Sequence, residues 1–413
     1  MELPKMIKIR QHFNREHIED IEGTVKEQIK SSGIKIERGS RIAIAVGSRG
    51  VANIHRIVKA TVEWIKEAGG EPFIVPAMGS HGGATADGQR AVLEGYGVTE
   101  EYTGAPIKSS METVELPQGN LINKVYMDKY AYEADGTIII NRIKVHTDFH
   151  GPTESGLMKM CVIGLGKHKQ ALEIHRYGVY GLKELIPKTA RQVLKHGNII
   201  LGIAVVENAY DETAIIRALR PSEIEVEEIK LLSYSRKNMP RIPFDKLDVL
   251  IVDEMGKNIS GTGMDTNIIN RIKIKNEPEP EGIKITNIVV SDLTEESHGN
   301  ALGMGLADFI TRKFADKIDF KATYENTITS TFIERAKMPI VGETDRDAIQ
   351  YALRTCGPID IKNARIVRIK NTLKLDEIYV SSSLLQEIQD KPGIDIVGEF
   401  VDILNEKGEL TEF

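Results

Sequence analysis

The sequence has few of the residues on which several protein classes depend. Only two of its 413 residues are cysteines, Cys161 and Cys356, which is too few for a disulfide framework or a thiolate metal cage and fits a reducing cytoplasm. A single tryptophan and an aromatic content of 6% argue against a nucleic-acid binder that stacks bases. The longest apolar stretches, at 138–141 and 198–209, fall short of the roughly 18 residues that a membrane-spanning helix requires. We therefore expect neither a disulfide scaffold nor an integral membrane protein.

An excess of positive charge is also absent. The 54 lysines and arginines are outnumbered by 60 aspartates and glutamates, which gives a net charge of −6. Such a chain has no general attraction for nucleic acid or anionic membranes, and a small anionic ligand would need a local basic pocket. The first residues, MELPKMIKIRQHF, lack the apolar core and the cleavage site of a secretory signal. We therefore expect a cytoplasmic protein with no nucleic-acid or membrane partner.

The sequence does contain short apolar runs that alternate with longer segments of helical period. This alternation is typical of parallel sheets covered by helices. It predicts strands at 41–47, 135–143 and 196–207, and helices at 51–70 and 180–197. The predicted fold class is therefore α/β.

The length of the chain suggests two domains, at roughly 100 to 200 residues for each. Pro240 and Pro243 precede a new strand at 248–256, and we place the domain boundary there. The prediction is an N-terminal α/β domain at 1–243 and a C-terminal α/β domain at 244–413, each with a mainly parallel sheet flanked by helices.

Three loops that follow predicted strands carry reactive side chains. They are GSRG at 47–50, GSHGG at 79–83 and NRIKVHTDFHGPTESGLMK at 141–159. Ligands of open parallel sheets bind beyond the carboxyl ends of the strands, and glycines beside Arg49 and His81 allow a ligand to approach the backbone. The alternative for each loop is a simple turn with a solvated polar residue.

Four of the ten histidines fall within 30 residues, namely His146, His150, His168 and His175, and Lys159 lies between them. Such a cluster suits an acid/base or metal site that binds an anion. The spacing fits neither a zincin helix nor a cysteine-rich zinc site, and the chain lacks a P-loop and the Gly-x-Gly-x-x-Gly of an NAD-binding domain. For His168 a solvated basic loop is the favoured interpretation.

One segment of this cluster resembles the nickel-dependent lactate racemase family. Ser155-Gly156-Leu157-Met158-Lys159 matches the family's Ser-Gly-x-x-Lys, and His175 follows the lysine by the family's spacing of 16 residues. The resemblance implies that Lys159 is joined covalently to a nickel-pincer nucleotide, with Ser155 and Gly156 in the cofactor-binding segment, and that His175 binds nickel. Without that spacing, His175 would be interpreted as a partly buried helix histidine.

Other loops carry the same resemblance. Gly79-Ser80-His81 is similar to the family's Gly-x-His, and His146 to its second catalytic histidine, although a short insertion lets His150 compete for that role. Arg49 matches the arginine of an Asp-x-Thr-Arg turn whose aspartate is missing here. The resemblance implies that His81 and His146 are the two catalytic bases and that Arg49 binds the substrate carboxylate.

The predicted second domain contains a further match. The segment 265–273 is similar to the family's Asp-x-Asn-x-Tyr-Gln-x-x-Lys, with Lys273 kept and Ile269 and Asn270 in place of the Tyr-Gln pair. The resemblance implies that Lys273 and Asn270 bind substrate together with His150, in an interdomain cleft that closes. A solvated surface lysine is the alternative for Lys273.

The resemblance also implies an isomerase, a racemase or epimerase of a 2-hydroxy acid. Hydride passes reversibly from C2 to the cofactor while a histidine takes the hydroxyl proton, and each histidine serves one enantiomer. Polar residues near the expected pocket, including Asp148 and those of the EESHGN loop at 295–300, predict a substrate larger than lactate, such as a sugar acid. These residues could instead cap helices.

Other functions stay open. They are a lactate or malate racemase, a divalent-metal isomerase or hydrolase built on the same histidines, and a non-catalytic protein that binds nucleotides or sugar acids. The expected partners are the small 2-hydroxy acid and, transiently, cofactor-maturation proteins. A homo-oligomer is left open.

Overall fold

The computed structural model describes residues 3–47, 50–389 and 391–413. They form two compact units, each described below by itself: Asn14–Met239, and Pro240–Phe413 together with the first 13 residues. The sequence analysis assigned 1–243 to one domain. The difference arises because the first strand pairs with strands near the C-terminus. No helix among the described residues is long and apolar enough to cross a membrane.

The unit Asn14–Met239 is built on a five-stranded sheet with the order β3-β2-β6-β7-β8. The first four strands are parallel and β8 is antiparallel to β7. The bounds are β2 (Arg41–Val46), β3 (Glu71–Pro76), β6 (Gly136–Arg142), β7 (Ile199–Glu207) and β8 (Thr213–Leu219). A separate hairpin joins β4 (Thr113–Leu116) and β5 (Val125–Asp128).

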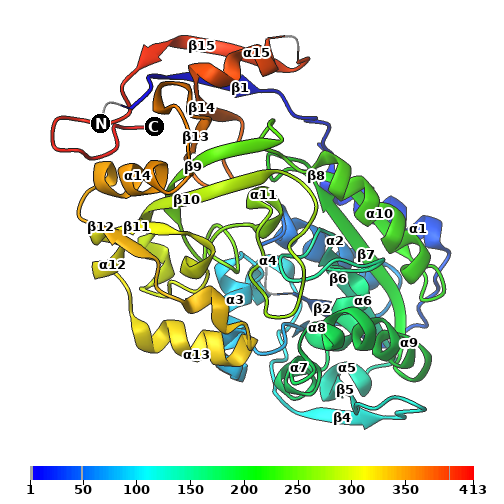
Figure 1. The fold of residues 1–413 in the computed structure, drawn as a ribbon. Coiled ribbons are helices and arrows are strands. Elements are labelled where there is room, and N and C mark those ends of the chain that lie inside the picture. The colour runs from blue at the N-terminus through cyan, green and yellow to red at the C-terminus, as the bar shows by residue number, and fades with distance from the viewer. Residues whose placement is uncertain (1–2, 48–49, 390) are drawn as a thin grey trace. The chain divides into compact units, whose positions relative to one another are not determined.

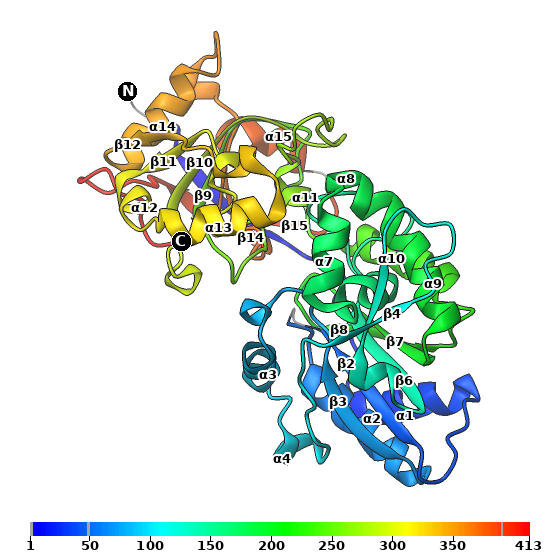
Figure 2. The same cartoon turned by 90° about the horizontal axis from the view of Figure 1, so that it is seen from below.

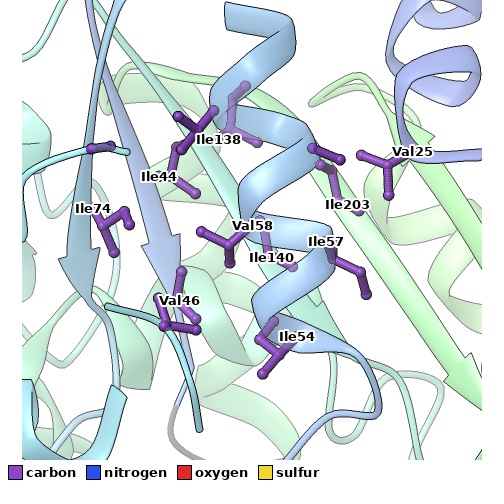
Figure 3. Close-up of a cluster of buried hydrophobic side chains, with 14 of the residues drawn as sticks. Val25, Ile44, Val46, Ile54, Ile57, Val58, Ile74, Ile138, Ile140 and Ile203 are labelled. Atoms are coloured by element: carbon purple, nitrogen blue, oxygen red, sulfur yellow. The ribbon is translucent and has the colours of Figure 1, made fainter. Parts of the chain in front are cut away.

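Helices α1 (Ile21–Ser32) and α2 (Ile54–Glu67) cover one face of this sheet. Apolar residues of α2 recur at helical spacing and are buried, so one stripe of the helix faces the strands. Figure 3 shows the resulting cluster, in which Ile57 and Val58 of α2 meet side chains such as Ile44 of β2 and Ile138 of β6. The other face is covered by α6 (Leu157–Lys159) and α10 (Ile224–Asn238), and α9 (Ile186–His196) packs against α6.

Close packing on that second face depends on Gly202 of β7. A Cβ atom at this position would lie 2.7 Å from Leu157 and 3.1 Å from Ile224. Both helices can therefore pack on this face of the sheet only because the residue there is glycine. The remaining helices of the unit are α3 (Ala86–Gly95), α4 (Glu100–Thr103), α5 (Lys129–Tyr132), α7 (Lys167–His175) and α8 (Gly178–Tyr180), with π-helical turns η2 (Met160–Gly164) and η3 (Gly181–Leu185) and the 3-10 turn η1 (Gly82–Ala84).

The second unit contains an eight-stranded sheet with the order β12-β11-β10-β9-β13-β14-β1-β15. The five strands from β12 to β13 are parallel, and the last three pair antiparallel (Figure 1, Figure 2). The bounds are β1 (Met6–Gln11), β9 (Lys246–Met255), β10 (Lys284–Leu293), β11 (Phe309–Thr311), β12 (Ile340–Gly342), β13 (Ile366–Ile369), β14 (Glu377–Ser381) and β15 (Ile394–Val401).

Helix α14 (Asp345–Arg354) covers one face of this sheet, and Ala348 and Ile349 pack there against the strands. It begins with a capping box between Thr344 and Asp347. The other helices are α11 (Thr266–Ile269), α12 (Arg312–Asp316), α13 (Phe320–Ser330) and α15 (Leu385–Ile388), with 3-10 turns η4 (Glu295–Ser297), η5 (Met304–Leu306), η6 (Ile333–Ala336), η7 (Ile361–Asn363) and η8 (Ser382–Leu384). The predicted α/β class, with mainly parallel sheets flanked by helices, is confirmed.

Candidate active site

The three loops singled out in the sequence follow the carboxyl ends of neighbouring strands of the five-stranded sheet. Strands β2, β3 and β6 are parallel neighbours, so their carboxyl ends lie side by side. Each loop starts at one of these ends. The structure thus brings together the segments that begin after Val46, after Pro76 and after Arg142.

The loop after β6 is organised by one buried carboxylate, that of Glu154. Its oxygens accept hydrogen bonds from the backbone N–H of His146 at 2.6 Å, from that of Gly151 at 3.1 Å and from Arg236 Nη2 at 2.6 Å. A backbone bridge between Lys144 and Ser155 closes the base of the loop. Glu154 therefore fixes the position of His146, a role that the sequence analysis missed because a lone glutamate in a polar loop gives no signal.

His146 lies against Lys159. Its Nε2 is 2.5 Å from Lys159 Nζ, and its Nδ1 accepts the backbone N–H of Asp148 at 3.0 Å, whereas the Asp148 carboxylate oxygen is 3.8 Å from Nδ1. Because a backbone N–H can only donate, Nδ1 is an acceptor in this contact, and Nε2 is the ring nitrogen that faces the lysine amine.

His175 at the end of α7 is held as a neutral ring. Burial lowers the pKa of His175 to about 4, a charged Lys159 adds to this shift, and Asp148 opposes it. At neutral pH the imidazole lone pair is therefore available to a metal ion.

The helical segment that carries Lys159 is anchored by Glu228 of α10. The buried Glu228 carboxylate accepts the backbone N–H of Met158 at 3.0 Å, at the start of α6. Gly156 makes room for it, since a Cβ atom there would lie 2.4 Å from the Glu228 carboxyl carbon. Burial raises the pKa of Glu228 to about 7, and the backbone N–H groups of Met158 and Leu157 oppose the rise. A signal for Glu228 exists in the sequence, because it shares the buried face of its helix with Ile224, Leu231 and Leu232.

Glu228→Gln should flatten the pH dependence of stability. The folded pKa, about 7, lies above the ordinary glutamate pKa of 4.5, so the folded protein holds this proton more tightly and loses stability as pH rises between these values. At roughly 1.4 kcal/mol for each pKa unit, the loss is on the order of 3 kcal/mol. We expect Glu228→Gln to unfold at higher denaturant concentration than the wild type at pH 8 and to lose this advantage at pH 5.

The matched control is Glu227→Gln, which alters the neighbouring, partly exposed carboxylate that pairs with Lys230 at 2.6 Å. Its denaturation midpoints at pH 5, 6, 7 and 8 should run parallel to those of the wild type. Equal pH dependence in wild type and Glu228→Gln would show that Glu228 does not titrate in this window.

His81 follows β3 and begins the turn η1, with its side chain exposed. Its loop packs on the segment that carries Lys159. Gly79 has φ +61°, and a Cβ atom there would lie 2.9 Å from Ile163 in η2. The structure thus brings the His81 loop and the Lys159 segment into contact.

The other predicted site residues in this unit are placed as follows. His150 exposes 41% of its side chain, and its Nδ1 is 3.4 Å from Glu154 Oε1, so it lies on the same loop as His146 but away from the contact with Lys159. Ser155 contributes backbone hydrogen bonds to Lys144. Arg49 lies outside the described residues.

Lys273 and Asn270 belong to the other unit. Burial lowers the pKa of Lys273, and Asp308, whose Oδ1 is 3.6 Å from Nζ, opposes the shift. The Asn270 amide donates to the backbone carbonyls of Pro280 and Ile283, at 2.9 and 3.2 Å. Both of its hydrogens therefore serve to hold the loop at 270–283.

The EESHGN loop uses several of its polar groups within its own unit. Ser297 Oγ accepts the backbone N–H of Lys257 at 2.9 Å, and the Asn300 amide donates to Asn326 at 3.1 Å. These contacts hold the loop to other segments of its own unit. Among the residues that the structure describes, no three His, Cys, Asp or Glu side chains form a set that could hold a metal ion by themselves.

Comparisons with known proteins agree with this fold. A family model described as a domain of unknown function, DUF362, matches residues 45–218. No curated protein matches the sequence. The structure of a Thermotoga maritima protein from a structural genomics consortium has a TM-score of 0.53 at 10% identity, over 86% of this chain and 97% of that one. The lactate racemase apoprotein of Thermoanaerobacterium thermosaccharolyticum has a TM-score of 0.51 at 12% identity, over 90% of this chain and 99% of that one. The chain therefore has a lactate racemase-like fold.

Proposed function

We propose that the protein is a racemase or epimerase of 2-hydroxy acids that uses a nickel-pincer nucleotide, joined covalently to Lys159, with nickel bound by His175. The observation that carries this proposal is the contact between Lys159 and His146, combined with a buried His175 whose pKa the charge of Lys159 helps to lower. The lactate racemase-like fold supports the same class of reaction.

The residues present fit this group. Covalent attachment needs a lysine amine, and the amine of Lys159 lies at the candidate site in contact with His146. Nickel accepts a neutral imidazole, and the low pKa of His175 keeps its ring neutral. When bound, the group would supply a hydride acceptor for the C2 hydrogen of the substrate.

The proposed work of His146 is to move the hydroxyl proton of the substrate. Nε2 is the proposed atom for this exchange, because it is the ring nitrogen that faces Lys159. His81, on the separate loop after β3, is the proposed second base, since inversion at C2 requires proton exchange for both enantiomers. Arg49 is proposed, from its sequence match, to bind the substrate carboxylate.

We further propose a substrate larger than lactate, such as a sugar acid epimerised at C2. Support comes from the loop after β6, where the Asp148 carboxylate lies 3.8 Å from His146 Nδ1 and the exposed His150 follows the buried Phe149. A tail with hydroxyl groups could pair with such side chains, and a methyl group could not.

The test is to produce the protein together with cofactor-maturation enzymes and to follow configuration at C2 with lactate, malate and several aldonic acids. We expect an aldonic acid to be epimerised, and we expect His81→Ala and His146→Ala each to slow both directions by roughly 10²-fold or more. A severe effect of His150→Ala together with a nearly silent His146→Ala would assign the second base to His150 instead. Fast racemisation of lactate with inert aldonic acids would overturn the substrate size only. A protein that carries the cofactor and inverts none of these acids would overturn the reaction.

A further inference from the structure

A network of fully buried polar side chains lies beneath the candidate site. Lys167, the first residue of α7, forms an ion pair with Asp128, with Nζ 3.1 Å from Oδ2, and both side chains have no exposed surface. The Lys167 ammonium also donates to the Pro76 carbonyl and, at 3.2 Å, to Gln89 Oε1. A buried charge is costly unless it is paired and hydrogen-bonded, and Lys167 meets both conditions.

Gln89 extends this network to the His81 loop. Its Nε2 donates to the backbone carbonyl of Gly79 at 2.9 Å and to that of His81 at 3.2 Å. Gln89 is itself fully buried on α3. The helix reaches the loop because Gly82 and Gly88 let the two backbones meet, since a Cβ atom at Gly88 would lie 1.9 Å from the Gly82 oxygen.

Lys167 and Gln89 together hold three carbonyls of one strand-end segment, those of Pro76, Gly79 and His81. The same lysine starts the helix that ends in His175, and its backbone adopts a left-handed φ of +57° that is unusual for this residue type. The buried network therefore connects the loop of His81, one proposed base, directly to helix α7, which carries the proposed nickel ligand His175.

We propose that Gln89 and Lys167 are positioning residues that fix the His81 loop relative to helix α7. The amide hydrogens of Gln89 hold the loop, and the Lys167 ammonium holds Gln89 in the orientation that presents them. This role in catalysis rests on the proposed function, whereas the mechanical role does not.

The test uses Gln89→Glu and Gln89→Met in the full-length protein without cofactor. The carboxylate introduced by Gln89→Glu would keep an acceptor for Lys167 but could not donate to the two carbonyls. The methionine variant removes the same hydrogen bonds without burying a further charge. In both, we expect hydrogen exchange of the loop amides of His81, Ala84 and Thr85 to quicken about tenfold or more at pH 8, because their protection depends on the loop staying closed.

The matched control is Gln170→Glu, a substitution at a fully buried glutamine of α7 that binds the backbone of Lys124 and Tyr126 instead. It should leave exchange in the loop unchanged. In the loaded enzyme, Gln89→Glu should lower kcat at pH 8 with little change in KM or attached mass. Part of the loss should be recovered at lower pH, where a protonated carboxyl can donate again.

Different results would overturn the positioning role and the proposed function. Wild-type exchange in the loop of both Gln89 variants would overturn the positioning role. Faster exchange in these variants, combined with no inversion of any hydroxy acid by the loaded wild type, would leave the positioning role intact and overturn the proposed function.

Discussion

Lys159→Ala, produced together with cofactor-maturation proteins, is expected to carry no added mass, whereas the wild type carries the mass of the cofactor. The reason is chemical, since alanine has no amine to form the bond. The fold should persist because the Lys159 side chain is only half-buried and contacts His146 rather than the hydrophobic core. Intact-mass spectrometry measures the first effect, and the melting temperature measures the second.

Two further variants make this result specific. Lys169→Ala removes an exposed lysine that lies over the Tyr126 ring, and it should keep the added mass. His175→Ala should keep much of the organic cofactor and lose nickel, because the two anchors are independent. A covalent adduct on Lys159→Ala would refute the assignment of the lysine, and unchanged nickel in His175→Ala would refute that of the ligand.

The largest effect on stability is expected for Asp128→Ala. This substitution leaves the Lys167 ammonium buried without its counter-charge and removes the cap that Asp128 provides to the Ala131 N–H at 2.9 Å. Breaking a buried pair in this way costs about 3 to 5 kcal/mol. For a unit of this size the melting temperature should fall by roughly 10 °C, which calorimetry can measure.

The paired replacement Asp128→Leu with Lys167→Met provides the sharper comparison. It removes both charges and fills the space with apolar atoms, so it should be less destabilised than Asp128→Ala alone. Glu112→Ala, which breaks the exposed pair between Glu112 and Lys129, should change the melting temperature little. A double variant that is less stable than Asp128→Ala would show that the buried charge is not the source of the cost.

The strands and helices around the site could be predicted because each carries a local pattern. The apolar run at 41–47 became β2, and the amphipathic segment at 51–70 became α2. The partner of β1 could not be predicted in the same way. Its residue Ile9 pairs with Ile378, and such a long-range pairing has no local signal.

The placement of Lys159 and His175 could likewise be predicted only in part. The spacing of 16 residues matched a known family, but a straight helix of that length would separate the two by about 24 Å. In the structure no straight helix joins them, because the chain turns at Lys167, where φ is +57°. Lys167 adopts this left-handed backbone conformation because of its buried contacts, since lysine itself does not favour it.

The position of β1 in the eight-stranded sheet determines which parts of the protein can be produced as separate fragments. The unit with the candidate site is a single stretch of chain, and its ends meet, since the side chains of Asn14 and Asn238 lie 3.5 Å apart. It is an insertion that could be produced as one fragment. The other unit cannot be obtained by truncation, because a fragment beginning at Pro240 lacks the strand that separates β14 from β15. Its sheet would end at a bare β14 edge, and β15 would lose its partner strand.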